Sequence, residues 1–205
     1  GFSYGQLGYS HHATEDYGVL NTLPEISIYT PGSKSEAILC IESCLNNDGV
    51  SYLRIDKSHF HEKDHKKGLP TDTNPRELFC GDETLIIGVG GILEEAFEVV
   101  NFFKEKLNQN IGLVSLPKIK PLNKKLLLNI MRDYKNIITL EEHNLVNGIS
   151  SIIKEVCFDN DFYPNEFHSF GINDLFSSVV GDQKFLRKEN KIDSDNLIKY
   201  IRSLK

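Results

Sequence analysis

The sequence lacks an excess of positive charge and a long apolar run. Its 23 lysines and arginines stand against 29 aspartates and glutamates, which gives a net charge of −6. This balance argues against a general nucleic-acid binder or an anionic-membrane binder, because both need a basic face. No apolar stretch approaches the roughly 20 residues that cross a bilayer, and no charged-then-apolar leader opens the sequence. The expected partner is therefore a small molecule or another protein.

Paired cysteine motifs are also lacking. Cys40, Cys44, Cys80 and Cys157 are scattered without a C-x-x-C spacing, so neither a zinc ribbon nor a disulfide framework is indicated. Cys40 and Cys44 lie one turn apart on one expected helix, where a disulfide would strain the backbone. This cysteine usage fits a reducing compartment, and we expect the protein in the cytoplasm.

The 205 residues are 40% hydrophobic, which is enough for one large or two small domains with a real core. Helical and strand-like patterns alternate along the chain, and this order is typical of an α/β fold with a parallel sheet covered by helices. A polar stretch with aromatics precedes the final helix. The patterns predict helices over 13–23, 35–47, 92–110, 124–134, 148–160 and 193–204, and strands over 25–31, 50–55, 84–91, 111–117 and 136–142.

Residues 56–82 interrupt this alternation. They read DKSHFHEKDHKKGLPTDTNPRELFCGD, with three histidines, several lysines and no apolar periodicity, which indicates a connection between domains. The predicted division is residues 1–65 for a first α/β part, 66–82 for the linker and 83–205 for a second domain. His59, His61 and His65 could offer metal ligands, but their spacing matches no known closed site. A solvated linker is the favoured alternative.

Two internal motifs could carry chemistry. The turn GVGG at 88–91 lies between a strand and a helix, where exposed amides can hold phosphate, but Leu93 replaces the third glycine of the dinucleotide fingerprint. Close packing of strand and helix is the favoured interpretation there. Glu141, Glu142 and His143 stand at a strand end, where two acids beside a histidine could transfer protons. A structural or interface role is the alternative.

The opening stretch GQLGYSHHATED, residues 5–16, is the strongest candidate site. Gly5 and Gly8 permit unusual φ values and allow the backbone to approach a ligand closely. They deliver His11 and His12 to the start of a helix, where histidines can donate to substrate hydroxyls or phosphates near neutral pH. On these residues alone, an ordinary loop is an equally weighted alternative.

Residues 5–31, GQLGYSHHATEDYGVLNTLPEISIYTP, resemble the transketolase pattern G-x-x-G-[PT]-T-H-[QH], followed by an acidic helix and a strand that ends in proline. The second half agrees independently. VSLPKIKPLNKKLLLNI, KNIITLEEHNLVNGISSIIKEV and FHSFGINDLF are similar to segments of the transketolase carboxyl-terminal domain. The GxLGxxHH variant is most similar to transketolase-like proteins associated with sugar biosynthesis. The resemblance covers nearly the whole chain except residues 56–82.

This resemblance implies a fold and a cofactor. The expected fold is the later part of a pyrimidine-binding α/β domain, followed by a three-layer α/β/α transketolase carboxyl-terminal domain with a mostly parallel five-stranded sheet. The expected activity in carbohydrate metabolism is transfer of a two-carbon ketol unit between sugars, with thiamine diphosphate and Mg²⁺ in the complete, homodimeric enzyme.

The resemblance also implies that parts of the enzyme lie elsewhere. The glutamate that activates the cofactor, and the domain that holds the diphosphate and metal, have no counterpart in these residues. Because the sequence also opens at Gly1 without methionine, we expect a fragment that needs a missing amino-terminal half or a partner subunit. Alone it should be inactive, bind no cofactor and hold no metal.

Site residues follow from the same resemblance. His11 matches the family histidine that faces the reacting end of the donor sugar, and is the expected catalytic residue. Lys57 falls near the family arginine that grips the sugar phosphate, although lysine loses the bidentate fork. Leu7 replaces an acid that touches a substrate hydroxyl, so the sugar preference should differ. The expected substrate-binding residues are Ser10, His11, His12 and Lys57, and the expected cofactor-binding residues are Gly5 and Gly8.

Two alternatives remain open at this point. One is a related thiamine diphosphate enzyme, either a deoxyxylulose-phosphate synthase or the β subunit of an oxo-acid dehydrogenase, although KIKPLN and EEHNL favour transketolase. The other is a non-catalytic dimerisation and interaction module.

Overall fold

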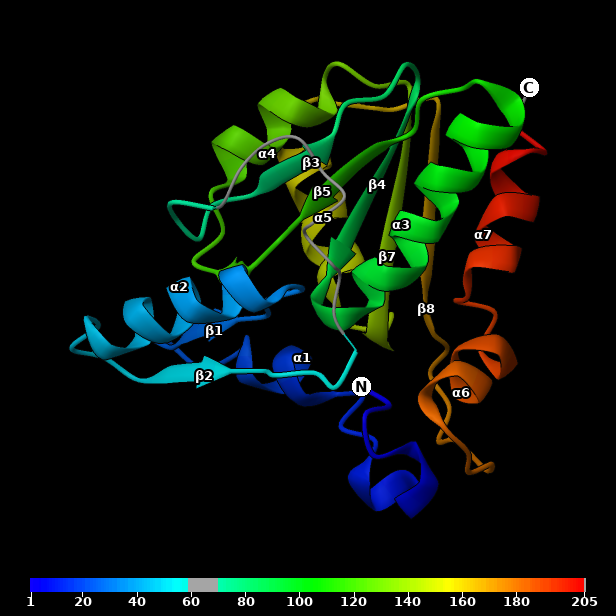
Figure 1. The fold of residues 1–205 in the computed structure, drawn as a ribbon. Coiled ribbons are helices and arrows are strands. Elements are labelled where there is room, and N and C mark those ends of the chain that lie inside the picture. Colours follow the sequence, from blue (N-terminus) through cyan, green and yellow to red (C-terminus); the bar gives the residue numbers. More distant parts are fainter. Residues whose placement is uncertain (59–69, 205) are drawn as a thin grey trace.

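The computed structural model describes residues 1–58 and 70–204, and they form two α/β units (Figure 1). The smaller unit begins with α1 (Asp16–Leu20), followed by β1 (Ser27–Tyr29), α2 (Lys34–Leu45) and β2 (Ser51–Leu53). Strands β1 and β2 are parallel, as a crossover through α2 requires. Helix α2 begins at an N-cap in which the Ser33 hydroxyl accepts a hydrogen bond from the Glu36 amide at 3.2 Å.

The larger unit contains a five-stranded sheet in the order β3-β5-β4-β7-β8. Strands β5, β4, β7 and β8 are parallel, and only the edge strand β3 is antiparallel. The strands are β3 (Arg76–Phe79), β4 (Thr84–Val89), β5 (Gly112–Ser115), β7 (Asn136–Asn144) and β8 (Glu166–Ile172), and the helices are α3 (Leu93–Phe102), α4 (Lys124–Met131), α5 (Ile149–Asp159), α6 (Gln183–Glu189) and α7 (Ser194–Ile201).

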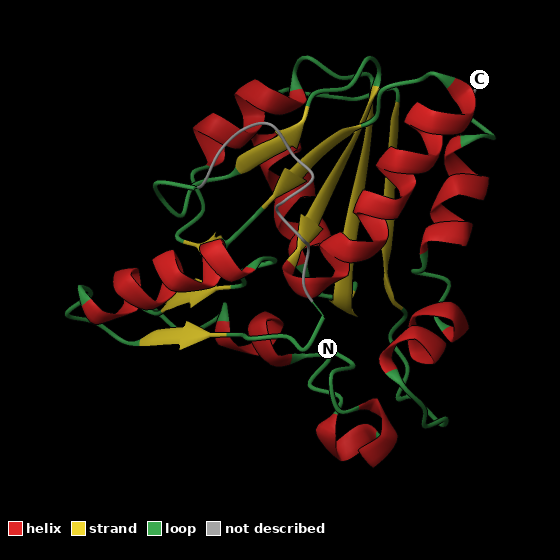
Figure 2. Ribbon diagram, in the orientation of Figure 1, coloured by secondary structure: helices red, strands yellow, loops and turns green. Residues whose placement is uncertain are grey.

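Helices cover both faces of this sheet (Figure 2). Strand β4 shows the reason, because all six of its residues are buried and alternate between two apolar cores. Ile86 packs with residues of α3 and α7 on one face, and Leu85 and Ile87 pack with residues of α4 and α5 on the other. The expected three-layer α/β/α fold with a mostly parallel five-stranded sheet is confirmed.

A short strand joins the two units. Strand β6 (Lys118–Lys120) follows β5 in the chain, yet it pairs antiparallel with β1 of the smaller unit through Ile28↔Lys120 and Tyr29↔Lys118. The Lys120 ammonium also donates to the Asn21 carbonyl at 2.6 Å. Residues from the two units therefore build one continuous structure.

Four elements had no sequence signal. Strand β3 lies in the predicted linker 66–82, and it pairs with β5 at the sheet edge. Strand β8 and helix α6 lie in the polar stretch with aromatics that precedes the final helix. Strand β6 has only three residues, two of them lysines. Each is short or at an edge, so its apolar pattern is incomplete.

Candidate functional site

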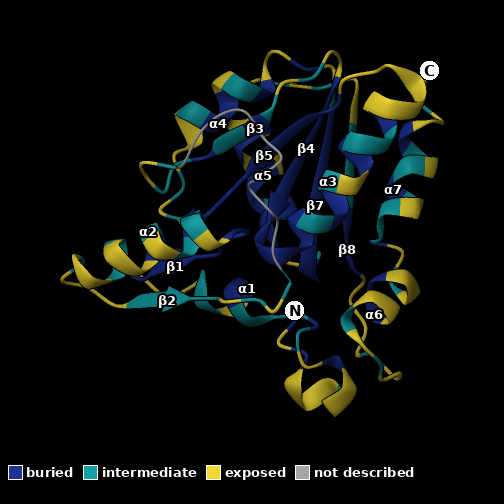
Figure 3. Ribbon diagram, viewed as in Figure 1, coloured by how far each residue is buried: buried dark blue, intermediate teal, exposed yellow. Residues whose placement is uncertain are grey.

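The carboxyl ends of β4 and β7 point toward the amino-terminal segment, α1 and α6 (Figure 1). In an α/β sheet, this end is where ligands are bound, because the loops there leave a crevice. Residues 1–13 form an opening loop at this end, and much of it is exposed (Figure 3). The sequence-predicted site residues lie on this loop or on the segment 56–58 that follows β2.

The two glycines of the opening loop have different structural roles. Gly8 has φ +81°, a left-handed value that favours glycine, and it joins two short 3₁₀ turns over Gly5–Leu7 and Tyr9–His11. Gly5 is buried, and a Cβ placed on it would lie 2.4 Å from Leu186 Cδ1 and 2.6 Å from the Gly181 carbonyl oxygen. Gly5 therefore makes room for the segment that leads into α6.

The adjacent histidines point in different directions. The His12 side chain is 0% exposed, and its Nε2 lies 3.0 Å from the Gly5 carbonyl oxygen. A carbonyl only accepts, so Nε2 carries the proton. His11 is exposed, and its Nδ1 lies 2.9 Å from the Ser10 hydroxyl. Of this pair, solvent reaches only His11.

Lys57 meets the opening loop. Its ammonium lies 3.8 Å from the centre of the Tyr4 ring, within cation–π range, and its backbone amide donates to the Ser3 hydroxyl at 3.2 Å. Lys57 is exposed. The structure thus brings the predicted phosphate-binding lysine to the same loop that carries Ser10 and His11.

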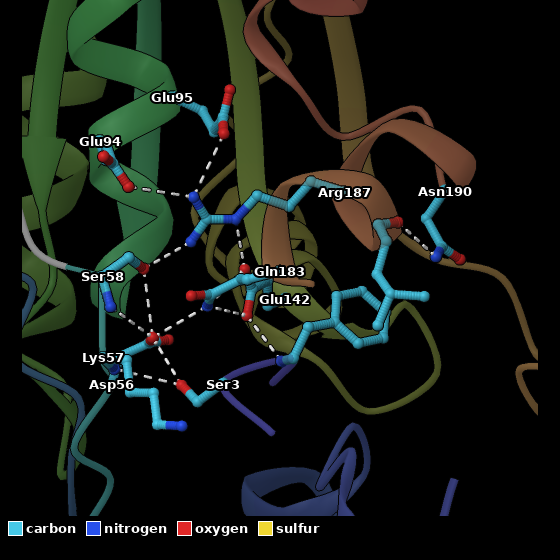
Figure 4. A network of polar contacts seen from close by, with 12 residues as sticks. Ser3, Asp56, Lys57, Ser58, Glu94, Glu95, Glu142, Gln183, Arg187 and Asn190 are labelled. Carbon is cyan, nitrogen blue, oxygen red and sulfur yellow. Dashed lines mark hydrogen bonds and ion pairs between the residues drawn. The ribbon is translucent and has the colours of Figure 1, made fainter. Parts of the chain in front are cut away.

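The residues on either side of Lys57 are held by a polar network (Figure 4). The Asp56 carboxylate accepts hydrogen bonds from the Ser3 hydroxyl at 2.7 Å and from the Gln183 amide at 2.9 Å. The Ser58 hydroxyl accepts from the Arg187 guanidinium at 2.6 Å. Burial by itself would raise the pKa of Asp56, but the hydrogen bonds from Gln183 and Ser3 and the charge of Arg54 keep that pKa below its usual value.

Arg187 is the centre of this network. It is fully buried, and its guanidinium contacts Glu95 at 3.2 Å, Glu94 at 3.3 Å and the Glu142 carboxylate. Burial would lower the pKa of Arg187, but the charges and hydrogen bonds of Glu142 and Glu95 raise it. The charged form is therefore strongly favoured, and it joins α6 to α3 and β7.

The Glu141–Glu142–His143 stretch joins the two units. The Glu141 carboxylate accepts from the Tyr17 hydroxyl at 2.5 Å and from the Ile149 and Ser150 amides at 2.8 and 3.0 Å. Burial is the largest cause of the raised pKa of Glu141. The Glu142 carboxylate accepts from the Phe2 amide at 2.8 Å. Both acids are buried, Glu141 between α1 and the start of α5 and Glu142 against the opening loop, so neither is open to a substrate.

His143 completes this junction. Its Nε2 accepts from the Gly18 amide at 3.1 Å, so Nδ1 carries the proton and donates to the Asn144 carbonyl at 2.7 Å. The ring stacks on Tyr17 with centroids 3.7 Å apart. Burial lowers the pKa of His143 to about 4, so the ring is neutral at pH 7. All three residues fit the interface interpretation, because none offers a free face for proton transfer.

Other sequence candidates have packing roles. A Cβ on Gly91 would lie 2.4 Å from the Ser58 carbonyl oxygen, so the GVGG turn makes room for the segment 56–58 rather than for a phosphate. His59, His61 and His65 lie outside the described residues. Within residues 1–58 and 70–204, no group of three or more histidine, cysteine, aspartate or glutamate side chains could hold a metal ion.

Residues 76–192 match the family model described as Transketolase, C-terminal domain. The chain belongs to this family. The resemblance to transketolases is therefore confirmed, and the match begins at the first residue of β3. In the part of the chain that the structure describes, no helix is both long and apolar enough to cross a membrane.

Two relatives illustrate the similarity. An apulose-4-phosphate transketolase subunit of Actinobacillus succinogenes is 30% identical over 206 residues, which cover 100% of this chain and 65% of the relative. A 1-deoxy-D-xylulose-5-phosphate synthase of Halothermothrix orenii is 30% identical over 174 residues, which cover 84% of this chain and 27% of the relative. The transketolase-family chain thus spans less than two thirds of the length of either protein.

Solved transketolases have the same fold. A split gene transketolase, described as an inactive beta4 tetramer, superposes with a TM-score of 0.78 at 21% identity, over 95% of this chain and 62% of that chain. A transketolase mutant from Pichia stipitis gives a TM-score of 0.69 at 16% identity, over 98% of this chain and 28% of that chain.

Sequence reasoning missed the side chains that hold segment 56–58. Gln183 and Arg187 lie in α6, which was not predicted, and both contact residues more than 120 positions earlier. The sequence shows only that Gln183 and Arg187 are four residues apart, which would place both side chains on one face of a helix.

Proposed function

We propose that this chain is the carboxyl-terminal part or subunit of a thiamine diphosphate-dependent transketolase-like enzyme that transfers a two-carbon ketol group between phosphorylated sugars. The proposal rests on one observation: Lys57 contacts Tyr4 and Ser3 of the opening loop, and the same loop carries the exposed His11. The names of both relatives contain a phosphorylated sugar, which supports a phosphate-binding role for the lysine.

In this proposal the exposed residues bind and orient the sugar. The Ser10 hydroxyl engages His11 Nδ1, which leaves Nε2 for a hydroxyl near the reacting end of the donor. Lys57 supplies a point charge for the substrate phosphate. His12 acts through the loop, because its hydrogen bond to the Gly5 carbonyl and its edge contact with Phe2 hold the two 3₁₀ turns in place.

The described residues of this chain do not by themselves fit thiamine diphosphate and its metal. The space beside Gly5 is filled by Leu186, and no cluster of metal ligands lies within residues 1–58 and 70–204. When bound, the cofactor supplies the electron sink for carbon–carbon cleavage. We infer that a partner subunit, or a further part of the same protein, holds the diphosphate and metal, and that the isolated chain is inactive.

An exposed apolar surface supports a partner subunit. The Tyr9 and Phe176 rings meet with centroids 4.4 Å apart, so the opening loop and the segment before α6 share one surface beside Ser10 and His11. Large exposed apolar patches mark interaction sites. We call the surface that these two rings share the Tyr9–Phe176 surface. The same two segments and the start of α6 also expose Tyr4, Leu7, Leu175, Val179, Val180 and Phe185. The Actinobacillus succinogenes relative is itself named as a subunit, which is consistent with such a partner.

The proposal is tested by reconstitution. The chain is assayed alone and with a complementary amino-terminal transketolase subunit, in the presence of thiamine diphosphate and Mg²⁺, for ketol transfer from a phosphorylated ketose to an aldose. We expect turnover only from the mixture, and we expect His11→Ala to lower kcat by about 100-fold. Turnover by the chain alone refutes its inactivity in isolation, and unchanged kinetics in His11→Ala refute the role of His11.

Similarity to the 1-deoxy-D-xylulose-5-phosphate synthase supports a second candidate, in which the enzyme forms 1-deoxy-D-xylulose 5-phosphate. Ketol transfer instead forms a ketose lengthened by two carbons and releases an aldose. Product analysis on the reconstituted enzyme therefore separates the two. A purely structural module would give neither product, and its dimerisation would be visible in solution scattering.

A further inference from the structure

Helix α6 holds both neighbours of Lys57. Gln183 donates to the Asp56 carboxylate at 2.9 Å, and Arg187 donates to the Ser58 hydroxyl at 2.6 Å (Figure 4). Gln183 and Arg187 lie four residues apart, so they project from the same face of α6. The segment that carries the lysine belongs to the smaller unit, and the helix that holds it belongs to the larger one.

The polar face of α6 is itself fixed. The Gln183 amide also donates to both oxygens of the Glu142 carboxylate at 3.0 Å. Arg187 contacts the same carboxylate and the Glu95 carboxylate. Glu142 lies on β7 and Glu95 on α3, so the position of α6 is set by the core of the larger unit.

Lys57 has few contacts of its own. Its amide meets Ser3, which also donates to Asp56, and its ammonium lies over the Tyr4 ring. A lysine stem is flexible, and ordering it costs free energy on binding. Holding the Asp56 and Ser58 side chains, on either side of Lys57, restricts the segment and so reduces the volume that the ammonium explores. The anchors at Asp56 and Ser58 therefore preorganise the lysine for its ligand.

We propose that Gln183 and Arg187 are positioning residues that hold Asp56 and Ser58 so that the Lys57 ammonium faces the phosphate of the sugar substrate. This inference rests on the proposed function, in which Lys57 binds that phosphate. Neither α6 residue touches the substrate. The carboxyl-terminal domain thereby contributes to substrate selection through the segment 56–58.

Gln183 is the cleaner residue to test. Arg187 is buried among carboxylates, so its removal would also disturb the fold. Gln183 is only half-buried, and Gln183→Met removes the donor at nearly constant length. Lys184→Met is the matched control, because Lys184 is the next residue of α6 and is exposed.

The experiment uses the reconstituted enzyme with matched phosphorylated and unphosphorylated acceptors. We expect Gln183→Met to raise KM for the phosphorylated sugar about tenfold, since the hydrogen bonds that tie the Asp56 carboxylate to α6 and α6 to Glu142 are lost. The kcat and the kinetics with the unphosphorylated sugar should stay within about twofold, and Lys184→Met should change neither. An equal loss for both sugars would overturn the inference.

A double-variant cycle separates this inference from the proposed function. We expect Lys57→Met to abolish the preference for phosphorylated sugar, and Gln183→Met to add no further loss in that background. If Lys57→Met leaves the preference intact, the phosphate-binding role of the proposed function fails, and the positioning role fails with it. If Lys57→Met abolishes the preference but Gln183→Met does not alter it, only the positioning role fails. Additive losses in the double variant also overturn that role.

Hydrogen exchange on the chain provides a readout besides activity. In Gln183→Met, the amides of Lys57 and Ser58 should exchange several-fold faster, whereas the amides of β4 should be unchanged. Unchanged exchange at residues 57 and 58 would contradict the anchoring role.

Discussion

At the residue scale, buried ionisable groups decide how the two units meet. Tyr17, Glu141 and His143 form one cluster, and Arg187 with Glu142 forms another. A buried charge is tolerated when it is paired and hydrogen-bonded, and a buried histidine is tolerated when it is neutral. We therefore expect the neutral His143 to make stability depend on pH, and the paired Arg187 to make stability depend on its positive charge.

The first prediction concerns the pH dependence of stability. Burial lowers the pKa of His143 from 6.5 to about 4. The nearby charge of Arg54 lowers it further, and the charge of Asp16 raises it by less than burial lowers it. Between these values the unfolded chain binds a proton that the folded chain does not, so stability is present above about pH 6.5 and falls as the pH is lowered toward 4. We expect a loss of about 2 kcal/mol from His143 between pH 7 and pH 5.

This pH effect is measured by urea unfolding at pH 7 and pH 5. In His143→Gln the free energy of unfolding should be lower at pH 7 but should change less between the two pH values. An equal change in both proteins would show that other groups cause it.

The second prediction concerns Arg187. Replacement by methionine leaves the buried Glu142 and Glu95 carboxylates without their cation. We expect Arg187→Met to lower the free energy of unfolding by about 3–5 kcal/mol. Urea denaturation measures the loss, and Lys188→Met, an exposed neighbour on α6, is the control. A loss no greater than in the control would mean that the network contributes little to folding.

At the element scale, helix α5 begins without a side-chain cap of its own. Its N-cap is Gly148, and the Glu141 carboxylate of β7 accepts from the first amides instead. A carboxylate at a helix N-terminus also interacts favourably with the helix dipole. A second element also acts across the two units. Strand β6 follows β5 in the chain of the larger unit, but it pairs with β1 and extends the sheet of the smaller unit.

The third prediction tests this cap. Glu141→Gln keeps the shape but removes the charge, and it should lower the free energy of unfolding by about 1–2 kcal/mol. Glu155→Gln, on the exposed face of α5, should change it by less than about 0.5 kcal/mol. Thermal and urea unfolding of both variants provide the comparison. Equal effects would contradict a capping role for Glu141.

At the scale of the whole molecule, the two units form one structure with an apolar surface at the candidate site. The junction includes the hydrogen bond from the Arg54 guanidinium to the Glu142 carbonyl at 2.8 Å and the hydrogen bond from the Phe2 amide to the Glu142 carboxylate. The Tyr9–Phe176 surface includes the exposed part of the opening loop, which Figure 3 shows in yellow. Ser10 and His11 follow Tyr9 directly in the opening loop, so a partner that covers the Tyr9 ring would lie next to them in the chain.

The fourth prediction concerns this surface. Phe176 is 74% exposed, and Phe158 on α5 is 72% exposed outside the Tyr9–Phe176 surface. Phe176→Asp should weaken assembly with the amino-terminal subunit at least tenfold, because a charge would be buried in an apolar contact. Phe158→Asp should leave assembly unchanged. Sedimentation of each mixture measures the association, and equal weakening by both variants would place the interface elsewhere.

Much of the fold could be predicted from the sequence. Strand β4 is a continuous apolar run because both of its faces are buried, and helix α3 has strong helical periodicity because it buries one face. The final predicted helix begins at Asp193, and the structure makes Asp193 its N-cap, with the side chain accepting from the Asn196 amide. Strands β3, β6 and β8 could not be predicted, since β3 and β8 are edge strands, β6 has only three residues, and the apolar pattern of each is incomplete.

The candidate site was predicted only in part. The motif at residues 5–12 placed two histidines side by side, but their different exposure depends on the packing of Phe2 and Gly5. The sequence of Glu141–His143 is compatible both with proton transfer and with a structural or interface role. Only its contacts with Tyr17, Gly18 and Phe2 favour the interface role.

The sequence by itself determined the α/β class, the order of the main elements and the transketolase family, because these depend on local periodicity and on motifs. The tertiary structure alone decided which histidine is exposed, that Lys57 lies over Tyr4, and that α6 holds the segment 56–58. These features depend on contacts between residues far apart in the chain. Such contacts are fixed only when the core closes and each buried polar group finds its partner.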